Sequence, residues 1–557
     1  MWMIIAHFMT RFEMKSKILA FAAVLLGCLS CVENDSSLGS NLIPLGQTYK
    51  FYTATIPLDN IELVMADSLS GYSSTRATTG SVRDSEYGLS TRACALTLVP
   101  IFKDSVVIGD NPVFKSFRFA IGRDTLSSNN PDQKRILQSI NVYELEAALD
   151  EKKDFDCNKK LAHGSERITK GVPVYNGGDS LTFSFNEEFG RKFLSLSKED
   201  FKDYDSYSKK MPGIYIETED PAVEGGRINM FNLQLGFDSD SYYFTGNYAK
   251  LNYSAEFEGE RRDTSILFYY GANKFHNMDS LLTTAATGSF PQYALNLTSQ
   301  QTGDKVGKAG DKILIEGGGG LKPLIRASEL KRLAEEAIME KGGIPSETVI
   351  NKASLVFPFE FPDDYTTMEY WPQVLSPTCR IVGDEVTAFM GLTDSSSDYE
   401  NQGDINRSIL NYAPDITYHL QELLKIDETD TESTKTKRFN KGSYDIWLLI
   451  MANETITTTS TGNQDLSDMY NYLAYQSYYN SMYGGYGYGY GSGYGSYYSN
   501  YYSYAMMAAY ASSSSTSTSV SVQLDKDRFY KAALNGPDCA NGRVPELRIT
   551  FAIPDEQ

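Results

Sequence analysis

Few residues of this 557-residue chain are suited to nucleophilic hydrolysis. A serine or cysteine nucleophile needs a neighbouring base, usually a histidine, and the sequence has only 4 histidines. Beyond residue 30 these are His163, His276 and His419, and no G-x-S-x-G motif occurs anywhere in the chain. We therefore expect ordinary loop or interface histidines and no catalytic serine or cysteine.

Motifs for metal and phosphate binding are also missing. No H-x-x-x-H or H-E-x-x-H pair occurs, so a zinc hydrolase is not expected. The acidic loop from Asp394 to Asp404 has oxygen ligands suited to Ca²⁺, but not in the order of a calcium-binding loop. The segment 303–309 is too short for a phosphate loop, and the glycines at 317–320 favour a tight turn or bulge over an anion site. We expect no metal and no cofactor.

Aromatic residues could bind carbohydrates, and acidic residues could cleave them. Tyr370 and Trp371 are the best candidates for an exposed aromatic platform that stacks on sugars, and plain core packing is the alternative. A polysaccharide-active enzyme would need a pair of carboxylates. The chain has 71 acidic residues, and nothing in the sequence distinguishes two of them.

A recurring tripeptide bears on modification. Asp followed by Ser or Thr and then an apolar residue is similar to the O-glycosylation acceptor of Bacteroidetes. The alternative is that Asp-Ser turns simply precede strands. The acceptor positions are Ser68, Ser105, Thr125, Ser180 and Ser280.

The N-terminal region predicts the compartment. Two lysines precede a short apolar run at 18–26, which is typical of a secretory signal and too short to span a bilayer. The small residues that follow resemble a bacterial lipobox. We expect Cys31 to carry the lipid, with Cys28 or an ordinary cleaved signal peptide as the alternatives. The acidic stretch after Cys31 resembles the surface-export signal of Bacteroidetes lipoproteins.

These features imply a lipid-anchored outer-membrane protein, exposed at the cell surface. Residues 1–30 are the expected signal peptide, with Met14 as an alternative start, and 31–47 the expected linker. Loss of residues 1–30 removes three basic and one acidic residue, so the formal net charge changes from −20 to −22. Such an acid excess argues against nucleic-acid binding. The expected partners are the membrane, through the lipid, and a glycan or other envelope proteins.

Most of the remaining chain predicts β-structure. Short β-branched or aromatic runs bounded by Gly, Asp, Asn or Pro predict strands, for example at 50–56, 116–121 and 140–145. The best helix covers 328–341, with Ser328 as its N-cap and Gly342 as its C-cap. We therefore expect an all-β fold with small helical inserts.

The cysteines beyond the lipobox show no C-x-x-C spacing, which argues against a zinc ribbon or a thioredoxin-like redox site. Whether they form disulfides stays open. They are Cys94, Cys157, Cys379 and Cys539.

A weak internal repeat predicts two copies of one module. A strand, a short helical stretch and two more strands occur in each half of the chain. They fall at 181–185, 187–194, 213–216 and 250–253, and again at 408–412, 416–424, 445–449 and 546–551. We predict two tandem β-sandwich (jelly-roll-like) modules at 48–275 and 276–557.

The segment 469–524 interrupts the second module. It has no charged residue and contains 16 of the 39 tyrosines, interleaved with Gly and Ser. It lacks the aliphatic residues that build a core, so we expect a flexible loop. Self-association through tyrosine rings is one possible role, and an expanded hairpin loop without a role is the alternative.

Several short motifs along the chain also share an order with a known family. They are A-D-S-L at 66–69, D-S-E-Y-G at 84–88, E-F-G at 188–190, P-G-I-Y-I at 212–216, G-G-G-G-L at 317–321, I-N-K-A at 350–353 and P-E-L-R-I-T-F at 545–551. In this order they resemble the Bacteroidetes putative-lipoprotein family catalogued as domain of unknown function 4270. The family has no established activity, so the resemblance implies location and fold more than mechanism. The last motif is also similar to the closing strand of secreted jelly-roll modules, some of which bind polysaccharides.

Taken together, the sequence favours a non-enzymatic cell-envelope lipoprotein with a binding or structural role, with glycan binding at the cell surface as one form of it. One alternative is a polysaccharide-active enzyme with an unidentified carboxylate pair. The other is a fimbrial or matrix assembly subunit.

Overall fold

The computed structural model contains two compact units, one formed by the described residues up to Tyr52 with those from Ala552, and a larger one formed by Thr53–Phe551. Cys28, Cys31 and the linker at 31–47 lie outside the described residues. The structure describes 48–555 except for 67–68, 74, 125–135, 151–155, 239–242, 272–274, 276–292, 302–304, 383–386, 395–402 and 460–515.

Antiparallel sheets make up most of the larger unit, and the helices are short inserts between strands, which confirms the predicted all-β class. The largest sheet has fourteen strands within the described part of the chain. Ten of them follow the order β10 (Val174–Tyr175), β8 (Gln138–Leu145), β12 (Ile214–Thr218), β5 (Gly88–Leu96), β4 (Arg76–Asp84), β13 (Gly225–Asn232), β7 (Asp110–Arg123), β16 (Ala249–Phe257), β17 (Glu260–Tyr270) and β6 (Leu98–Pro100). The other four pair beside this path: β11 (Ser180–Ser184), β18 (Ala294–Gln301), β3 (Tyr72–Ser73) and β9 (His163–Arg167).

The core of this sheet is rich in phenylalanine, and β7 shows why. Buried Phe117, Phe119 and Ile121 alternate with exposed or half-buried residues, so one face of the strand carries the large apolar side chains. The ring of Phe119 stacks on Phe183 of β11, with centroids 4.5 Å apart. Burial of such aromatic side chains supplies much of the driving force for folding.

Helix α2 (Glu187–Leu194) covers this core, at the position predicted from the sequence. Its N-cap Asn186 accepts a hydrogen bond from the backbone N–H of Phe189. Phe189, Phe193 and Leu194 are buried, and the helix contacts β7. The neighbouring helices are η2 (Lys198–Phe201) and α3 (Tyr204–Lys210).

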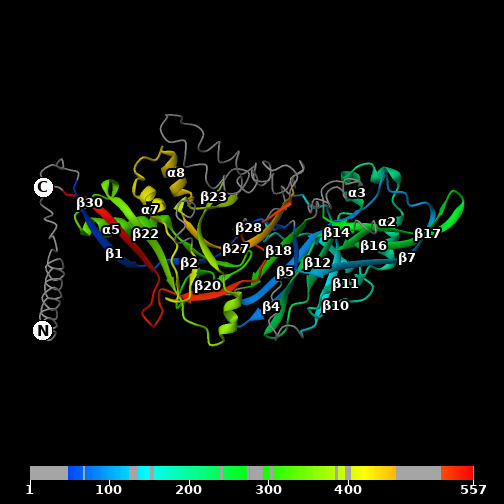
Figure 1. Cartoon of the computed structure of the whole chain (residues 1–557), viewed down its shortest axis with the longest axis horizontal. Helices are drawn as coiled ribbons and strands as arrows, with labels where there is room; N and C mark the ends of the chain where they lie inside the picture. The colour runs from blue at the N-terminus through cyan, green and yellow to red at the C-terminus, as the bar shows by residue number, and fades with distance from the viewer. Residues whose placement is uncertain are drawn as a thin grey trace, which may run out of the picture. The chain divides into compact units, whose positions relative to one another are not determined.

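Strands of the second half of the chain, together with β1 and β2, form two further sheets; Figure 1 labels β22 of one and β27 of the other. The seven-stranded sheet contains β19 (Gly307–Lys308), β2 (Ile61–Met65), β21 (Leu321–Ile325), β27 (Ile446–Thr459), β23 (Val374–Val382) and β24 (Thr387–Gly391), with β28 (Thr516–Leu524) paired to β27. The five-stranded sheet has the order β1 (Tyr49–Pro57), β30 (Glu546–Pro554), β22 (Val349–Pro358), β26 (Asn411–Tyr412) and β25 (Ile405–Asn406). Two small sheets pair β14 (Leu235–Asp238) with β15 (Tyr243–Gly246) and β20 (Lys312–Glu316) with β29 (Lys531–Asn535).

The long helix of this half begins at a different residue from the predicted one, whereas the helical stretch predicted at 416–424 is found as α7 (Thr417–Leu424). Helix α5 (Ala327–Glu340) has Arg326 and not Ser328 as its N-cap, and Gly342 with φ +81° follows its last turn as expected. The first backbone N–H of α5 donates to Asp445 Oδ1 at 2.8 Å, so a residue 118 positions away caps the helix. The remaining helices are η4 (Pro345–Glu347), η5 (Tyr365–Tyr370), α7 (Thr417–Leu424) and α8 (Thr434–Asn440).

The two sets of repeated elements share a pairing pattern. In the first set β7 lies between β11 and β16, and α2 packs on β7. In the second set β22 lies between β26 and β30, and α7 packs on β22. The order strand, helix and return strand therefore occurs in both halves of the chain. The division into two tandem sandwich modules stays a prediction.

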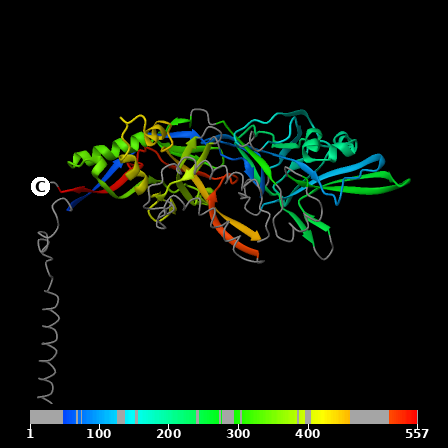
Figure 2. The same ribbon diagram turned by 90° about the horizontal axis from the view of Figure 1, so that it is seen from above.

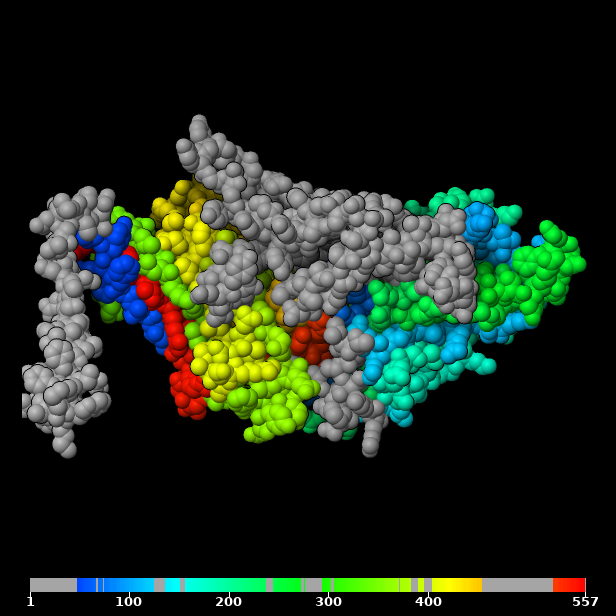
Figure 3. Space-filling view, viewed as in Figure 1, coloured from blue at the N-terminus to red at the C-terminus, as the bar shows by residue number. Residues whose placement is uncertain are grey.

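Strand pairing crosses the expected boundary between residues 275 and 276. Strand β18 pairs with β5, and β2 pairs with β21. In Figure 3 the blue surface of β1 lies beside the red surface of β30, in agreement with their pairing in the five-stranded sheet. Residues from both expected modules therefore contribute to the same sheets.

The Tyr-rich segment is bracketed by one hairpin, which Figure 2 shows as two strands side by side. Strands β27 and β28 pair from Met451–Leu524 to Thr459–Thr516. The prediction of a loop over the whole of 469–524 was wrong at its end, because 516–524 forms β28. Alternation of Val520, Val522 and Leu524 with small polar residues accounts for this strand.

Candidate functional site

A groove lies on one face of the five-stranded sheet. It measures about 360 Å³. Strands β1, β30 and β22 contribute to it, and so do the residues after β26, which pair with β22 at Ser354 and Asp415. Its lining consists of Thr53, Ala54, Thr55, Lys352, Ser354, Val356, Ala413, Asp415, Arg548, Ile549 and Thr550.

The three strands place polar residues in this groove, and the apolar Ala54, Val356 and Ile549 line it as well. Ala353 and Leu355 of β22 are fully buried on the opposite face, where α7 packs. Lys352 and Ser354 point the other way and line the groove. The sheet thus has one face covered by a helix and one hollowed face, which is lined by hydroxyl, charged and apolar side chains.

Three charged side chains lie among the hydroxyl groups of the groove. Arg548 bonds to Glu546 Oε2 on its own strand at 2.8 Å. Asp415 Oδ1 accepts the N–H of Thr417 at 2.9 Å, which fixes the carboxylate at the start of α7. Lys352 is exposed and forms no ion pair with a carboxylate of the described residues. The groove therefore offers fixed acceptors and a cation available to a ligand.

The predicted aromatic platform lies elsewhere. Trp371 is only 5% exposed, and its ring packs edge-on against Phe359 at a centroid distance of 5.1 Å. The side chain of Tyr370 lies outside the described residues. Trp371 is therefore a core residue, which agrees with the packing alternative and leaves no exposed indole face for a sugar.

Sequence reasoning did not identify the residues of the groove. Thr53 and Thr55, Lys352 and Ser354, and Arg548 and Thr550 each show the spacing of two that places residues on one strand face. This signal was visible in the sequence. The pairing of three strands from distant parts of the chain was not visible, because no local pattern encodes it.

Two of the five candidate glycosylation acceptors can be placed. Ser105 and Ser180 are both exposed, the latter at the start of β11. Ser68, Thr125 and Ser280 lie outside the described residues. Asp124, which precedes Thr125, is buried and forms an ion pair with Arg76 at 3.0 Å.

The two described histidines are packed against neighbouring groups. His163 stacks on Tyr143 and on Tyr215, with ring centroids 4.7 and 4.5 Å away. His419 is buried in α7, and its Nε2 lies 3.0 Å from the carbonyl oxygen of Tyr444. Burial lowers the pKa of His419 to about 4. A neutral, enclosed imidazole of this kind is suited to structure more than to general-base catalysis. His276 lies outside the described residues.

The four described cysteines are unpaired, and three of them are buried. Burial raises the pKa of Cys94 to about 12 and also raises the pKa of Cys157 and of Cys379. A thiol is nucleophilic only as the thiolate, so these three are unreactive at neutral pH. Cys539 is half-buried, and its thiol lies 3.0 Å from the side-chain oxygen of Asn541.

Among the described residues, no three or more His, Cys, Asp or Glu side chains lie close enough together to hold a metal ion. In the predicted calcium loop, Asp394 has another role. Its carboxylate accepts the N–H groups of Tyr418 and His419 and caps helix α7. Burial raises the pKa of Asp394 to about 6. Residues 395–402 of this loop lie outside the described residues.

The glycines at 317–320 form the predicted tight turn, and it encloses buried charges. Lys322 Nζ donates to the carbonyl oxygens of Glu316, Gly318 and Gly320. Arg92 Nη2 donates to the carbonyl of Gly317 at 2.8 Å. A Cβ atom at residue 318 would lie 2.9 Å from Arg92 Nη2, and φ is +59° there, so glycine is required. The turn binds cationic side chains of its own chain through carbonyl oxygens.

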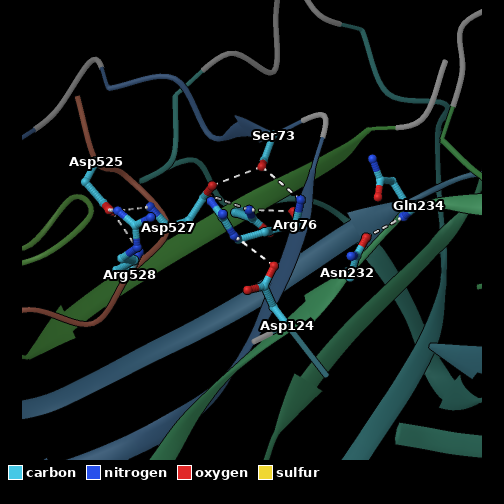
Figure 4. A network of polar contacts seen from close by, with 9 residues as sticks. Ser73, Arg76, Asp124, Asn232, Gln234, Asp525, Asp527 and Arg528 are labelled. Atoms are coloured by element: carbon cyan, nitrogen blue, oxygen red, sulfur yellow. Dashed lines mark hydrogen bonds and ion pairs between the residues drawn. The ribbon is translucent and has the colours of Figure 1, made fainter. Parts of the chain in front are cut away.

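A second buried polar network joins distant segments, as Figure 4 shows. Ser73 Oγ donates to Asp527 Oδ2 at 3.0 Å, and Asn296 Nδ2 donates to Asp527 Oδ1 at 2.9 Å. Asp525 pairs with Arg528 beside them. The segment that follows β28 is thereby fixed to β3 and β18. The network consists of satisfied structural contacts and is not an open site.

No helix in the described part of the chain is long and apolar enough to cross a membrane. In comparisons with protein-family models, with curated proteins and with solved structures, the chain matched none. The resemblance to the putative-lipoprotein family therefore stays a prediction that rests on the motifs quoted above.

Proposed function

We propose that the chain is a lipid-anchored, surface-exposed protein of the bacterial outer membrane that acts by non-covalent binding. The lipobox-like sequence before Cys31 supports the anchor, and the formal charge of −22 beyond residue 30 is compatible with attachment by a lipid more than by charge. A glycan is the ligand class that we favour.

The observation that carries the binding role is the groove on the five-stranded sheet. Its lining combines hydroxyl groups, two cations and the carboxylate of Asp415. Glycoside hydrolysis requires two carboxyl groups about 5–10 Å apart, and Asp415 is the one acidic residue in the lining. The chemistry of this groove therefore suits recognition of a polar ligand more than cleavage.

The anchor is tested by mass spectrometry and detergent-phase partition of the chain expressed in a Bacteroidetes host. Cys31→Ala should move the protein from the detergent phase to the aqueous phase, and the matched Cys28→Ala variant should stay in the detergent phase. The opposite pattern would assign the lipid to Cys28, and an unlipidated wild-type chain would refute the anchor.

The non-catalytic role is tested by incubating the protein with polysaccharides and measuring new reducing ends. We expect none above the background of a heat-denatured control. Release of reducing ends that is lost in Asp415→Asn would instead establish the polysaccharide-active alternative and place its chemistry in the groove.

A further inference from the structure

We propose that the groove on the five-stranded sheet binds a short segment of an acidic polysaccharide, one whose sugars carry carboxylate groups. This inference rests on the proposed binding function and names the ligand class for it. The evidence is the charge, the hydroxyl content and the size of the groove.

The groove offers a cation without an ion-pair partner among the described residues, on a chain with a large excess of acidic residues. The lining contains Lys352 and Arg548 against the single acidic residue Asp415, whereas the whole chain has a formal net charge of −20. Arg548 is already paired with Glu546, so within the described part of the chain Lys352 supplies the unpaired positive charge that is complementary to an anion. Lys352 has no carboxylate partner among the described residues, so its ammonium can pair with a ligand carboxylate without breaking an existing ion pair.

The hydroxyl groups of the groove favour a ligand that both donates and accepts hydrogen bonds, which a simple anion does not do. Thr53, Thr55, Ser354 and Thr550 can each donate and accept a hydrogen bond. Asp415 adds a fixed acceptor, held by the N–H of Thr417. Sugars present many hydroxyl groups that donate and accept in the same way. An acidic peptide would match the cations but would leave most of these hydroxyl groups to water.

The size and form of the groove suit a short oligosaccharide. Its volume of about 360 Å³ lies at the lower end of the range for small-ligand pockets, about 300–1,000 Å³. The lining comes from strands β1, β30 and β22 and from the residues after β26 that pair with β22, so the groove runs across several strands. A chain of sugars can lie across such a face and contact each strand in turn.

The test is calorimetric titration of the full lipidated chain, in neutral detergent, with three probes of equal length. These are tetragalacturonate, maltotetraose and tetraglutamate, which present hydroxyls with carboxylates, hydroxyls alone and carboxylates without hydroxyls. We expect tetragalacturonate to bind more tightly than both others, and its affinity to fall as salt is added.

Variants then place the binding in the groove. Lys352→Gln and Arg548→Gln should each weaken tetragalacturonate binding about tenfold or more, as expected for loss of a charge-assisted hydrogen bond. Thr550→Val should weaken it less. The control is Lys209→Gln with Lys210→Gln, on exposed positions of α3 away from the groove, and it should leave the affinity unchanged. Thermal unfolding of each variant shows that it is folded.

Several results would overturn the inference. Equal affinity for maltotetraose would show that the carboxylates are not recognised, and equal affinity for tetraglutamate would show attraction of any polyanion. No binding of any probe, or binding that Lys352→Gln and Arg548→Gln do not change, would also refute it. Lipid attachment at Cys31 is measured separately, so failure of the groove and failure of the anchor are distinguishable.

Discussion

Single side chains in this protein often satisfy backbone groups that lie far away in the sequence. Asp394 and Asp445 supply the carboxylates that cap α7 and α5, and Lys322 is held by carbonyl oxygens of the glycine turn. The sequence predicted the turn but not the enclosed ammonium, because the burial of Lys322 depends on neighbours from β5 and from the segment after β28. Burial of an amine without such acceptors would cost several kcal/mol.

The adjacent groups Asp394 and His419 should have opposite effects on stability as pH changes. Asp394 has its pKa raised from 3.8 to about 6, so its contribution is present at low pH and is lost as pH rises through that range. His419 has its pKa lowered from 6.5 to about 4, so its contribution is present at high pH and is lost as pH falls. Each shift corresponds to about 3 kcal/mol, and the two nearly cancel between pH 4 and 6.5.

Asp394→Asn should therefore show the effect of His419 on the pH dependence of stability without the cancelling effect of Asp394. We expect its free energy of unfolding to rise by about 3 kcal/mol more than that of the wild type between pH 4 and 6.5. Urea unfolding at a series of pH values measures this difference. His419→Gln should show the reverse slope, and parallel profiles for wild type and Asp394→Asn would show that Asp394 does not titrate in this range.

The two placed acceptors of the Asp-Ser pattern allow a test of glycosylation. Ser105 and Ser180 are exposed, so we expect each to carry a glycan when the protein is secreted by a Bacteroidetes host. Intact-mass measurement should show one mass step lost in Ser105→Ala and another in Ser180→Ala. Exposed Ser265→Ala or another serine outside the pattern is the control, and an unmodified wild-type mass would end the idea.

At the level of elements, local patterns predicted which segments form strands and helices better than the residues at which these elements begin and end. Strands β7, β8 and β12 were expected from short runs of β-branched and aromatic residues, and they form where one face meets the aromatic core. The start of α5 was predicted incorrectly because Asp445, and not Ser328, supplies its cap. A cap that comes from another part of the chain leaves no local signal.

The hairpin of β27 and β28 should not need the segment at its tip. Thr459 pairs with Thr516, so 56 residues lie between the paired ends. Replacement of 460–515 by Asn-Gly, which favours a two-residue hairpin turn, should keep the pairing. Each halving of a loop lowers the entropic cost of closing it by about 0.6 kcal/mol, and this replacement corresponds to between four and five halvings. The shorter loop should therefore stabilise the fold by about 2–3 kcal/mol.

Denaturant unfolding of the shortened chain measures this gain. A large loss of stability would show that the replaced segment packs on the fold. Light scattering of the same variant tests the assembly role: an unchanged oligomeric state would remove the Tyr-rich segment from assembly, and dissociation of a wild-type oligomer would support the fimbrial or matrix alternative.

At the scale of the whole molecule, the expected modules share their sheets. Strand β18 covers one edge of β5, and Leu295 of β18 belongs to the same core cluster as Tyr72 and Ala95. Removal of 276–557 would expose this cluster and leave β2 without β21. We therefore expect the fragment 48–275 to lack a cooperative unfolding transition.

Coexpression provides the matching control for this prediction. The fragments 48–275 and 276–557 produced together should associate and recover a cooperative transition, because the β18–β5 and β2–β21 pairs can reform. Cooperative thermal unfolding of 48–275 alone, measured by circular dichroism, would show that the first half is an independent domain.

The groove is also a property of the whole molecule, because distant segments of the chain form it together. Its lining combines residues near 53, 352 and 550, and each pair shows the strand spacing in the sequence. No property of one segment indicates that the other two will lie beside it. The all-β class could therefore be predicted from the sequence, whereas the candidate binding site could not.

The hydrogen bond between Ser73 and Asp527 limits how early during synthesis the protein can finish folding. The two residues are 454 positions apart. At about 5–20 residues synthesised per second, the second partner appears roughly 20–90 s after the first. During that interval β18 and β21, which pair with β3 and β2, are already made, but the buried contacts to Asp527 cannot form. The buried network thus makes completion of the fold a late event, after most of the polypeptide has been made.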